Sequence, residues 1–180
     1  MNAMENVLTF WFEECTPKQW FEKNIKFDVM IAQRFGDIIE RASQGELAFW
    51  RLSIRGRLAE IIVLDQFSRN VWRDTPKAFA QDKMALVLAQ EAIKQSDYNM
   101  LTLSQRKFIL MPFMHSESRF IHQQAVELFR GLGDESTLNY EMQHKAIIDR
   151  FGRYPHRNAI LERPSTKEEI DFLQQPNSSF

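Results

Sequence analysis

The most basic stretch of the chain, "RFGRYPHRN" at residues 150–158, contains side chains suited to binding an anion. Arg150, Arg153, His156 and Arg157 stand there within nine residues, and no acidic residue lies among them. A guanidinium group carries five donors in a fixed fork and binds a carboxylate or phosphate through two parallel hydrogen bonds. An imidazole gains or loses a proton near neutral pH. The stretch therefore predicts recognition of an anion, either a small ligand or a carboxylate of the chain itself.

Asp65 and Arg69 fall on a helical face that is predicted to be apolar. At 100° per residue, they share the sector of Leu58, Ile61 and Ile62. A charge removed from water is costly unless it is paired and hydrogen-bonded. The two charges, four residues apart, must therefore contact each other or a third group.

Two later helices repeat this pattern. Glu117, at the start of a helix predicted at 117–130, points in the same direction as Gln124 and Leu128 and also suits the helix dipole. His122 points away from this face and is expected at the surface. His144 lies inside the apolar sector of the next helix. Three helices with titratable groups on apolar faces predict a shared polar cavity, lined by Asp65, Arg69, Glu117, His144 and the 150–158 loop.

The rest of the chain must build the helices that carry these residues. A chain of 180 residues is long enough for one domain with a single core. Only six glycines and six prolines interrupt a sequence that is 44% apolar, which favours long helices. The pattern predicts an all-α single domain over residues 1–175, an array of about nine antiparallel helices, with a frayed tail at 176–180. Helices are expected after the capping box of Thr16, from Asp28 to about Gly45, at 54–70, 77–95, 103–113, 117–130 and 137–151, and after the capping box of Thr166.

The 150–158 loop is expected to turn back toward the helices. Gly152 is suited to end the helix at 137–151, since glycine accepts the left-handed backbone of a helix C-terminus. Pro155 prevents the helix from continuing and favours an extended backbone at Tyr154. Arg153 and Arg157 would then point at the predicted cavity.

Composition excludes several kinds of protein. A net charge of −1 gives no general attraction for nucleic acid or for an anionic membrane. Cys15 is the only cysteine, so an intramolecular disulfide and a thiolate metal cluster are excluded, and a reducing cytoplasm is the expected location. The N-terminal residues lack the pattern of a targeting signal, and no apolar run is long enough for a membrane span.

A series of motifs in the chain resembles the bacterial DUF924 family. The motifs are "LDQFSRN" (64–70), "FAQD" (79–82), "PFMHSE" (112–117) and "IIDRFGRYPHRNAILERPSTKEE" (147–169), with "VLTFWF" and "WF" near the start. The resemblance implies an all-α, tetratricopeptide-like fold and no established activity. The chain departs from the family pattern at two positions: it has Glu162 where the family has Gly, and Tyr154 where the family has Phe. Carried over by motif, the positions of interest are Asp65, Gln66, Arg69, Asn70, His115, Glu117, His144, Arg150, Arg153, His156, Arg157 and Asn158.

These residues are consistent with four different roles. The first is a structural network of ion pairs with no ligand. The second is a pocket for a small anion, in which the ligand-binding residues are Arg69, Asn70, Arg150, Arg153, Arg157 and Asn158. In an enzymatic form, His144 or His156 acts as general acid or base and Asp65 or Glu117 orients the imidazole.

The other two roles have weaker support in the sequence. A metal would use His115, Glu117, His144 and Asp65, but the arginines nearby repel a cation, so no metal and no cofactor is expected. A protein partner would bind through exposed aromatic residues such as Trp11, Trp20, Trp50 or Trp72. The sequence therefore predicts a small anion or a protein as partner.

Overall fold

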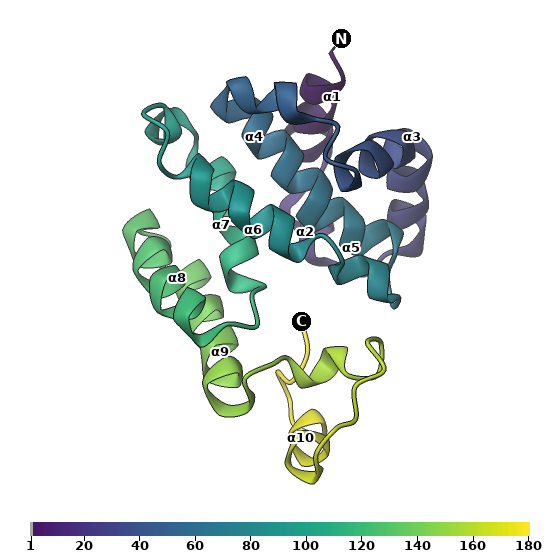
Figure 1. The fold of residues 1–180 in the computed structure, drawn as a ribbon, viewed down its shortest axis with the longest axis vertical. Helices are drawn as coiled ribbons and strands as arrows, with labels where there is room; N and C mark the ends of the chain where they lie inside the picture. The colour runs from purple at the N-terminus through teal and green to yellow at the C-terminus, as the bar shows by residue number, and fades with distance from the viewer. Residues whose placement is uncertain (1) are drawn as a thin grey trace. The chain divides into compact units, whose positions relative to one another are not determined.

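A computed structural model describes residues 2–180, and within that range all regular structure is helical and no strand is present (Figure 1). The prediction of an all-α protein is confirmed. The chain forms two compact units, one of residues up to Arg73 together with Lys77–Pro112, the other of Asp74–Pro76 together with Phe113–Phe180. The single domain and the tetratricopeptide-like arrangement stay predictions.

The first unit contains the helices before residue 112. Their bounds are α1 Ala3–Thr9, α2 Pro17–Phe21, α3 Ile25–Ser43, α4 Ile54–Ile61, α5 Ser68–Val71, α6 Asp82–Ala92 and α7 Leu103–Met114, whose last two residues belong to the second unit. Thr16 and Gln19 form the predicted capping box before α2. Helix α3 starts earlier than predicted, because the side chain of Asn24, and not that of Asp28, accepts hydrogen bonds from its first backbone N–H groups.

Helices α4 and α5 are joined by the π-helical segment Ile62–Phe67 into one continuous helical stretch. The predicted helix at 54–70 corresponds to this stretch. Every residue of the π-helical segment is buried, including Asp65 and Gln66. The π-helical segment therefore places two polar side chains inside the first unit. Short π-helical segments are often found at functional positions.

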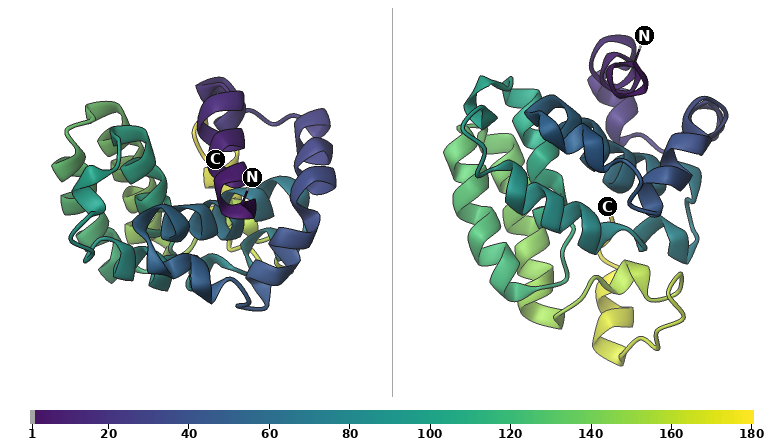
Figure 2. Two further views of the ribbon diagram at one scale, coloured as in Figure 1. Left: turned by 90° about the horizontal axis from the view of Figure 1, so that it is seen from above. Right: turned by 45° about the horizontal axis from the view of Figure 1, so that its top comes forward.

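The second unit is built on the antiparallel pair α8 Arg119–Leu132 and α9 Glu135–Phe151, which lie side by side (Figure 2). Gly133 and Gly152 both adopt the left-handed backbone that ends these helices, as predicted for Gly152. A 3-10 turn at Pro155–Arg157 and helix α10, Lys167–Leu173, complete the unit. Thr166 caps α10 in the predicted capping box.

The buried face of α8 is not the predicted one. The side chains that face inward are those of His122, Ala125, Val126, Phe129 and Leu132, and His122 is fully buried. On the face that was expected to be buried, Gln124 is exposed to solvent and Leu128 is partly exposed. The prediction was wrong because it oriented the buried face by Glu117, which lies in the segment before α8, and not by the apolar residues Ala125, Phe129 and Leu132.

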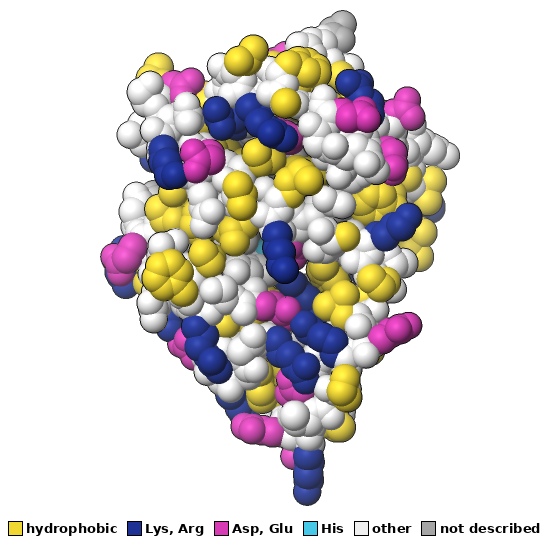
Figure 3. Space-filling view, viewed as in Figure 1, with side chains coloured by type: hydrophobic (Ala, Val, Ile, Leu, Met, Phe, Trp, Pro, Cys, Tyr) yellow, Lys and Arg dark blue, Asp and Glu magenta, His cyan; other side chains and the backbone are white. Residues whose placement is uncertain are grey.

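The aromatic residues considered as partner anchors are largely internal. Trp11 and Trp50 are buried, and Trp20 and Trp72 are only partly exposed. The face drawn in Figure 3 shows acidic and basic side chains next to one another rather than a field of one sign. Within residues 2–180, no helix is both long and apolar enough to cross a membrane.

Candidate functional site

The predicted pair of Asp65 and Arg69 is present in the first unit, and a third group joins it. The Nη1 of Arg69 donates to Oδ1 of Asp65 at 3.1 Å and to Oδ1 of Asp82 at 2.8 Å, while its Nη2 donates to Oδ2 of Asp82 at 3.0 Å. Gln66 donates to the other oxygen of Asp65 at 2.6 Å. Asp82, within the motif "FAQD", is therefore the partner that the sequence reasoning missed.

Asn70 belongs to a second polar cluster in the same unit. Its amide donates to Oδ1 of Asp28 at 2.8 Å, and Arg73 binds the same carboxylate through Nε at 2.6 Å and Nη2 at 2.8 Å. Asp28 is 9% exposed, so its predicted role as a helix cap is replaced by that of a buried ion-pair partner. No pattern at helical spacing links residues this far apart in the chain.

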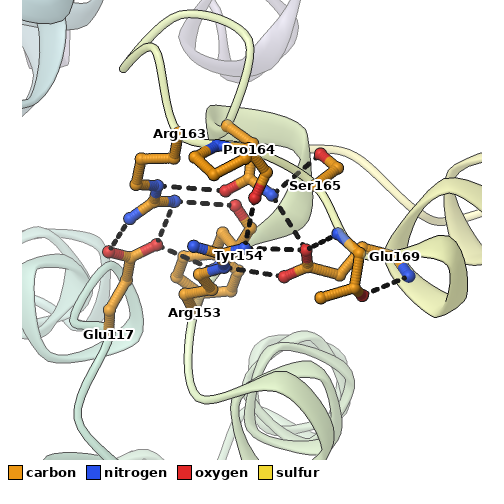
Figure 4. A network of polar contacts seen from close by, with 9 residues as sticks. Glu117, Arg153, Tyr154, Arg163, Pro164, Ser165 and Glu169 are labelled. Carbon is orange, nitrogen blue, oxygen red and sulfur yellow. Dashed lines mark hydrogen bonds and ion pairs between the residues drawn. The ribbon is translucent and has the colours of Figure 1, made fainter.

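In the second unit, Glu117 connects the segment before α8 to the arginine-rich loop (Figure 4). Its Oε2 accepts from Nη1 of Arg163 at 2.7 Å, and its Oε1 accepts from Nη2 of Arg163 at 2.9 Å and from the backbone N–H of Tyr154 at 2.7 Å. Burial alone would raise the pKa of Glu117, but the hydrogen bonds from Arg163 and Tyr154 outweigh it, so that the pKa is lowered. Arg163 was not among the predicted site residues.

Arg153 makes a second fork-to-fork pair, with Glu169 of α10 (Figure 4). Its Nε and Nη2 donate to the two oxygens of Glu169 at 2.7 and 2.8 Å, and Nη2 also donates to the carbonyl of Pro164 at 2.8 Å. Asn158 donates to Glu169 at 3.3 Å. The hydrogen bond from Arg153, opposed by burial, lowers the pKa of Glu169 to about 2. The sequence pattern indicated Glu169 only as a capping-box residue.

The remaining arginines of the 150–158 loop differ in their surroundings. Arg150 forms an exposed ion pair with Glu168. Arg157 is 6% exposed, donates to the carbonyl of His115 at 3.0 Å and places its guanidinium 4.7 Å from the centre of the Tyr154 ring. Three of the four arginines in and after the loop therefore bind carboxylates of the chain itself, and Arg157 is bound to a carbonyl and an aromatic ring.

All four histidines of the chain belong to the second unit. The rings of His122, His144 and His156 lie 6.3, 5.7 and 5.6 Å from the ring of Tyr154. The Nδ1–H of His144 donates to the carbonyl of Tyr140 at 2.7 Å, which fixes the orientation of the imidazole. We call His122, His144, His156 and Tyr154 the histidine cluster.

The pKa of His144 is lowered to about 3, mainly because burial disfavours the charged imidazolium. The positive charges of His115, His122 and His156 lower this pKa further, against the hydrogen bond to Tyr140. His144 is therefore a neutral imidazole at physiological pH.

His122 forms a buried pair with Glu141 of α9. Its Nδ1 lies 2.7 Å from Oε1 of Glu141, and its Nε2 lies 2.8 Å from the carbonyl of Ser116. Because a carbonyl only accepts, Nε2 carries a hydrogen, and one proton lies between Nδ1 and the carboxyl group. Burial raises the pKa of Glu141, against the hydrogen bond and charge of His122. The pair is net neutral wherever that proton resides.

We expect Glu141→Gln to gain stability relative to the wild type as pH rises above 4.5, the ordinary pKa of a glutamate. Because the pKa of Glu141 is raised, the folded pair of Glu141 and His122 keeps its shared proton after the glutamate of the unfolded chain has ionised, so the wild type loses stability as pH rises. Glutamine has no such titration and can donate to Nδ1 of His122. Urea unfolding of both proteins at several pH values measures the difference, and a constant difference would contradict the raised pKa.

The predicted site residues are thus divided between the two units. Asp65, Gln66, Arg69 and Asn70 lie in the first, and His115, Glu117, His144, Arg150, Arg153, His156, Arg157 and Asn158 lie in the second. A cavity shared by all of them stays a prediction. Across residues 2–180, no three His, Cys, Asp or Glu side chains form a group that could hold a metal ion.

Comparison with known proteins agrees with the motif series. The family model described as bacterial protein of unknown function (DUF924) matches residues 7–177. The structure of the protein of unknown function ATU0120 from Agrobacterium tumefaciens is similar, with a TM-score of 0.90 and 36% sequence identity over 95% of this chain and 96% of that one. Among curated proteins, none matches the chain. The chain therefore belongs to the DUF924 family, whose function is unknown.

Proposed function

We propose that the second unit binds a small anion, a phosphate or a carboxylate, beside His144, His156 and Arg157. The observation that supports this most directly is the nature of the charges around His144. The pKa of His144 is lowered by the charges of His115, His122 and His156, and of these three His122 is paired with a carboxyl group, that of Glu141. A buried group surrounded by basic side chains is a place where an anion is stabilised.

The ion pairs of the loop limit which arginine can bind the anion. Arg153 and Arg163 are held by Glu169 and Glu117 in geometry that uses both oxygens of each carboxylate. An incoming anion would have to displace a carboxylate of the chain from either arginine. Arg157 donates to the carbonyl of His115, and an anion would compete well for this donor because charge-assisted hydrogen bonds are stronger.

Binding should depend on pH with a definite sign. An anion beside His144 raises the pKa of the imidazole, which is about 3 without ligand, so that binding takes up a proton only as the pH falls toward that value. The affinity for sulfate, whose own charge is constant above about pH 4, is therefore expected to stay level near neutral pH and to rise as the pH falls toward 4. Because acid also weakens the fold, the measurement belongs in the range where the protein without ligand stays folded.

A thermal-shift experiment with inorganic phosphate, phosphorylated metabolites and dicarboxylates tests the proposal. A ligand at 100 times its Kd stabilises the folded state by about 2.7 kcal/mol, which raises Tm by several degrees. Arg157→Gln should abolish the shift, whereas Arg150→Gln, which changes an exposed arginine in the last turn of α9, should keep it. The absence of a shift for any anion with the wild type would refute anion binding.

A purely structural role is the second candidate, and the pairs of Arg153 and Arg163 support it. Both arginines are partly buried and tie the loop to α10 and to the segment before α8. If the histidine cluster serves only packing, Arg157→Gln should lower the free energy of unfolding by a few kcal/mol and no anion should restore it. The two candidates therefore differ in their response to ligand.

An enzymatic form of the anion site would use His144 as a general base, which requires that the bound anion raise the pKa of His144 from about 3 toward the working pH. With Nδ1–H bound to Tyr140, its Nε2 carries the lone pair that accepts a proton. The group that orients this imidazole is a backbone carbonyl, and neither Asp65 nor Glu117 is needed for that task. Hydrolysis of activated phosphate and carboxylate esters that is lost in His144→Gln would support this form.

A further inference from the structure

The side chain of Phe180 covers the ring of His144. The two ring centres are 3.8 Å apart with an angle of 27° between the planes, which is face-to-face stacking. The ring of His156 stands edge-on to Phe180 at 6.2 Å. Nevertheless Phe180 remains 51% exposed, so this ring is a cover on the histidine cluster and not part of a closed core.

Few bonds hold the segment that carries Phe180. The last backbone hydrogen bond of good geometry before it runs from Gln175 N–H to the carbonyl of Phe172, and residues 176–180 form a turn and an irregular end outside any helix. Ser178 is buried and its hydroxyl donates to the carbonyl of Leu173 at 3.2 Å. Phe180 can therefore leave His144 at the cost of one hydroxyl bond and its two ring contacts, with His144 and His156, without unfolding a helix.

His144 is well suited to present a flat surface. Its Nδ1–H bond to Tyr140 fixes the plane of the ring, and its low pKa keeps the ring uncharged. A neutral, fixed imidazole stacks on any planar ring of similar size. The guanidinium of Arg157 lies over the neighbouring Tyr154 ring, so a donor for an anionic group and a stacking surface belong to the same cluster.

We propose that Phe180 occupies a subsite for a planar aromatic ring, and that the ligand of the second unit is an anion that carries such a ring. This inference rests on the anion site proposed above and specifies its ligand class. The ligand stacks on His144 in place of Phe180 and directs its phosphate or carboxylate toward Arg157. Phe180 then acts as an internal competitor that keeps the ring of His144 covered in the absence of ligand.

Phenyl phosphate and inorganic phosphate form a matched pair of probes, because they differ by the ring alone. The full chain, Phe180→Ala and Phe120→Ala are titrated with each probe by calorimetry. Phe120, on α8, is 65% exposed and serves as a control for the loss of an exposed phenylalanine. Removing a competitor that occupies the subsite most of the time should strengthen phenyl phosphate binding to Phe180→Ala by about tenfold or more, and leave phosphate binding within about twofold.

The outcomes separate the two proposals. If phosphate binds but phenyl phosphate binds no more tightly to Phe180→Ala than to the wild type, the ring subsite is refuted and the anion site stands. If neither probe binds any of the three proteins, both proposals fail. An equal gain in affinity for phenyl phosphate in Phe120→Ala would also refute the subsite, because it would show that the gain does not require uncovering His144.

Two further ligands test which chemical class of ligand supplies the aromatic ring. Benzoate represents aromatic acids, and adenosine monophosphate represents nucleotides, both of which carry an anion on a planar ring. Tighter binding of either one to Phe180→Ala supports the inference and identifies the source. Unchanged Kd values for benzoate, adenosine monophosphate and phenyl phosphate alike would overturn it.

Discussion

We expect the wild type to lose about 2 to 4 kcal/mol of stability relative to His144→Gln when the pH falls from 7 to 4. The reason is that burial, together with the neighbouring histidines, lowers the pKa of His144 from 6.5 to about 3. In the unfolded chain the imidazole takes up a proton near its ordinary pKa, but in the folded protein it does not. Stability from this group is therefore complete above about pH 6.5 and is lost as the pH falls toward 3.

Glutamine is neutral over this whole range, so the comparison isolates His144 from the carboxylates that also titrate in acid. Urea unfolding at pH 7, 6, 5 and 4 gives the free energy of unfolding of both proteins. Glu168→Gln, which changes an exposed carboxylate, is the control and should follow the wild type. A constant difference between His144→Gln and the wild type would show that the pKa of His144 is the same in the folded and unfolded states, which contradicts the lowered pKa.

The sequence predicted the local features of the fold and missed those that join distant segments. The capping boxes of Thr16 and Thr166 and the end of α9 at Gly152 depend on residues within one or two turns, and all three are confirmed. The first residue of α3 was wrong because two neighbouring polar residues, Asn24 and Asp28, can both cap a helix. Local chemistry alone does not choose between them.

The polar contacts show the same limit more sharply. Asp65 and Arg69 were predicted as a pair because they are one helical turn apart. Glu117 and Arg163 are separated by 46 positions, and no periodicity connects them. His122 was expected at the surface because a histidine on a polar face is usually solvated, but Glu141 of the neighbouring helix provides a buried partner.

The concentration of arginine after α9 has a physical explanation in the second unit. The loop has little regular structure, so its backbone groups need partners from side chains. Arg153 binds the carbonyl of Pro164 and Arg163 binds that of Tyr154, while Glu117 accepts the Tyr154 N–H. Each of these arginines also binds a carboxylate. The loop is thereby held in one conformation, which is what a binding site beside Arg157 requires.

Glu117→Ala is expected to lower the free energy of unfolding by about 2 to 4 kcal/mol at pH 7. The change removes three hydrogen bonds at once and leaves Arg163, whose side chain is 23% exposed, and the N–H of Tyr154 without this carboxylate. Because the pair is partly exposed, water replaces some of the lost hydrogen bonds, and the expected loss of stability is smaller than for a fully buried pair. Glu117→Gln should cost less, because its amide oxygen still accepts one of the three bonds.

The matched control is Glu168→Ala, which breaks the exposed pair with Arg150 and should cost less than about 0.5 kcal/mol. A double-mutant cycle with Arg163→Met then separates the pair from its surroundings. If Glu117 acts through Arg163, the double variant should be less destabilised than the sum of the two single changes, because neither partner is left with an unpaired charge. Additive losses would assign the effect of Glu117 to the backbone of Tyr154 instead, and the loop would then be held by that single N–H.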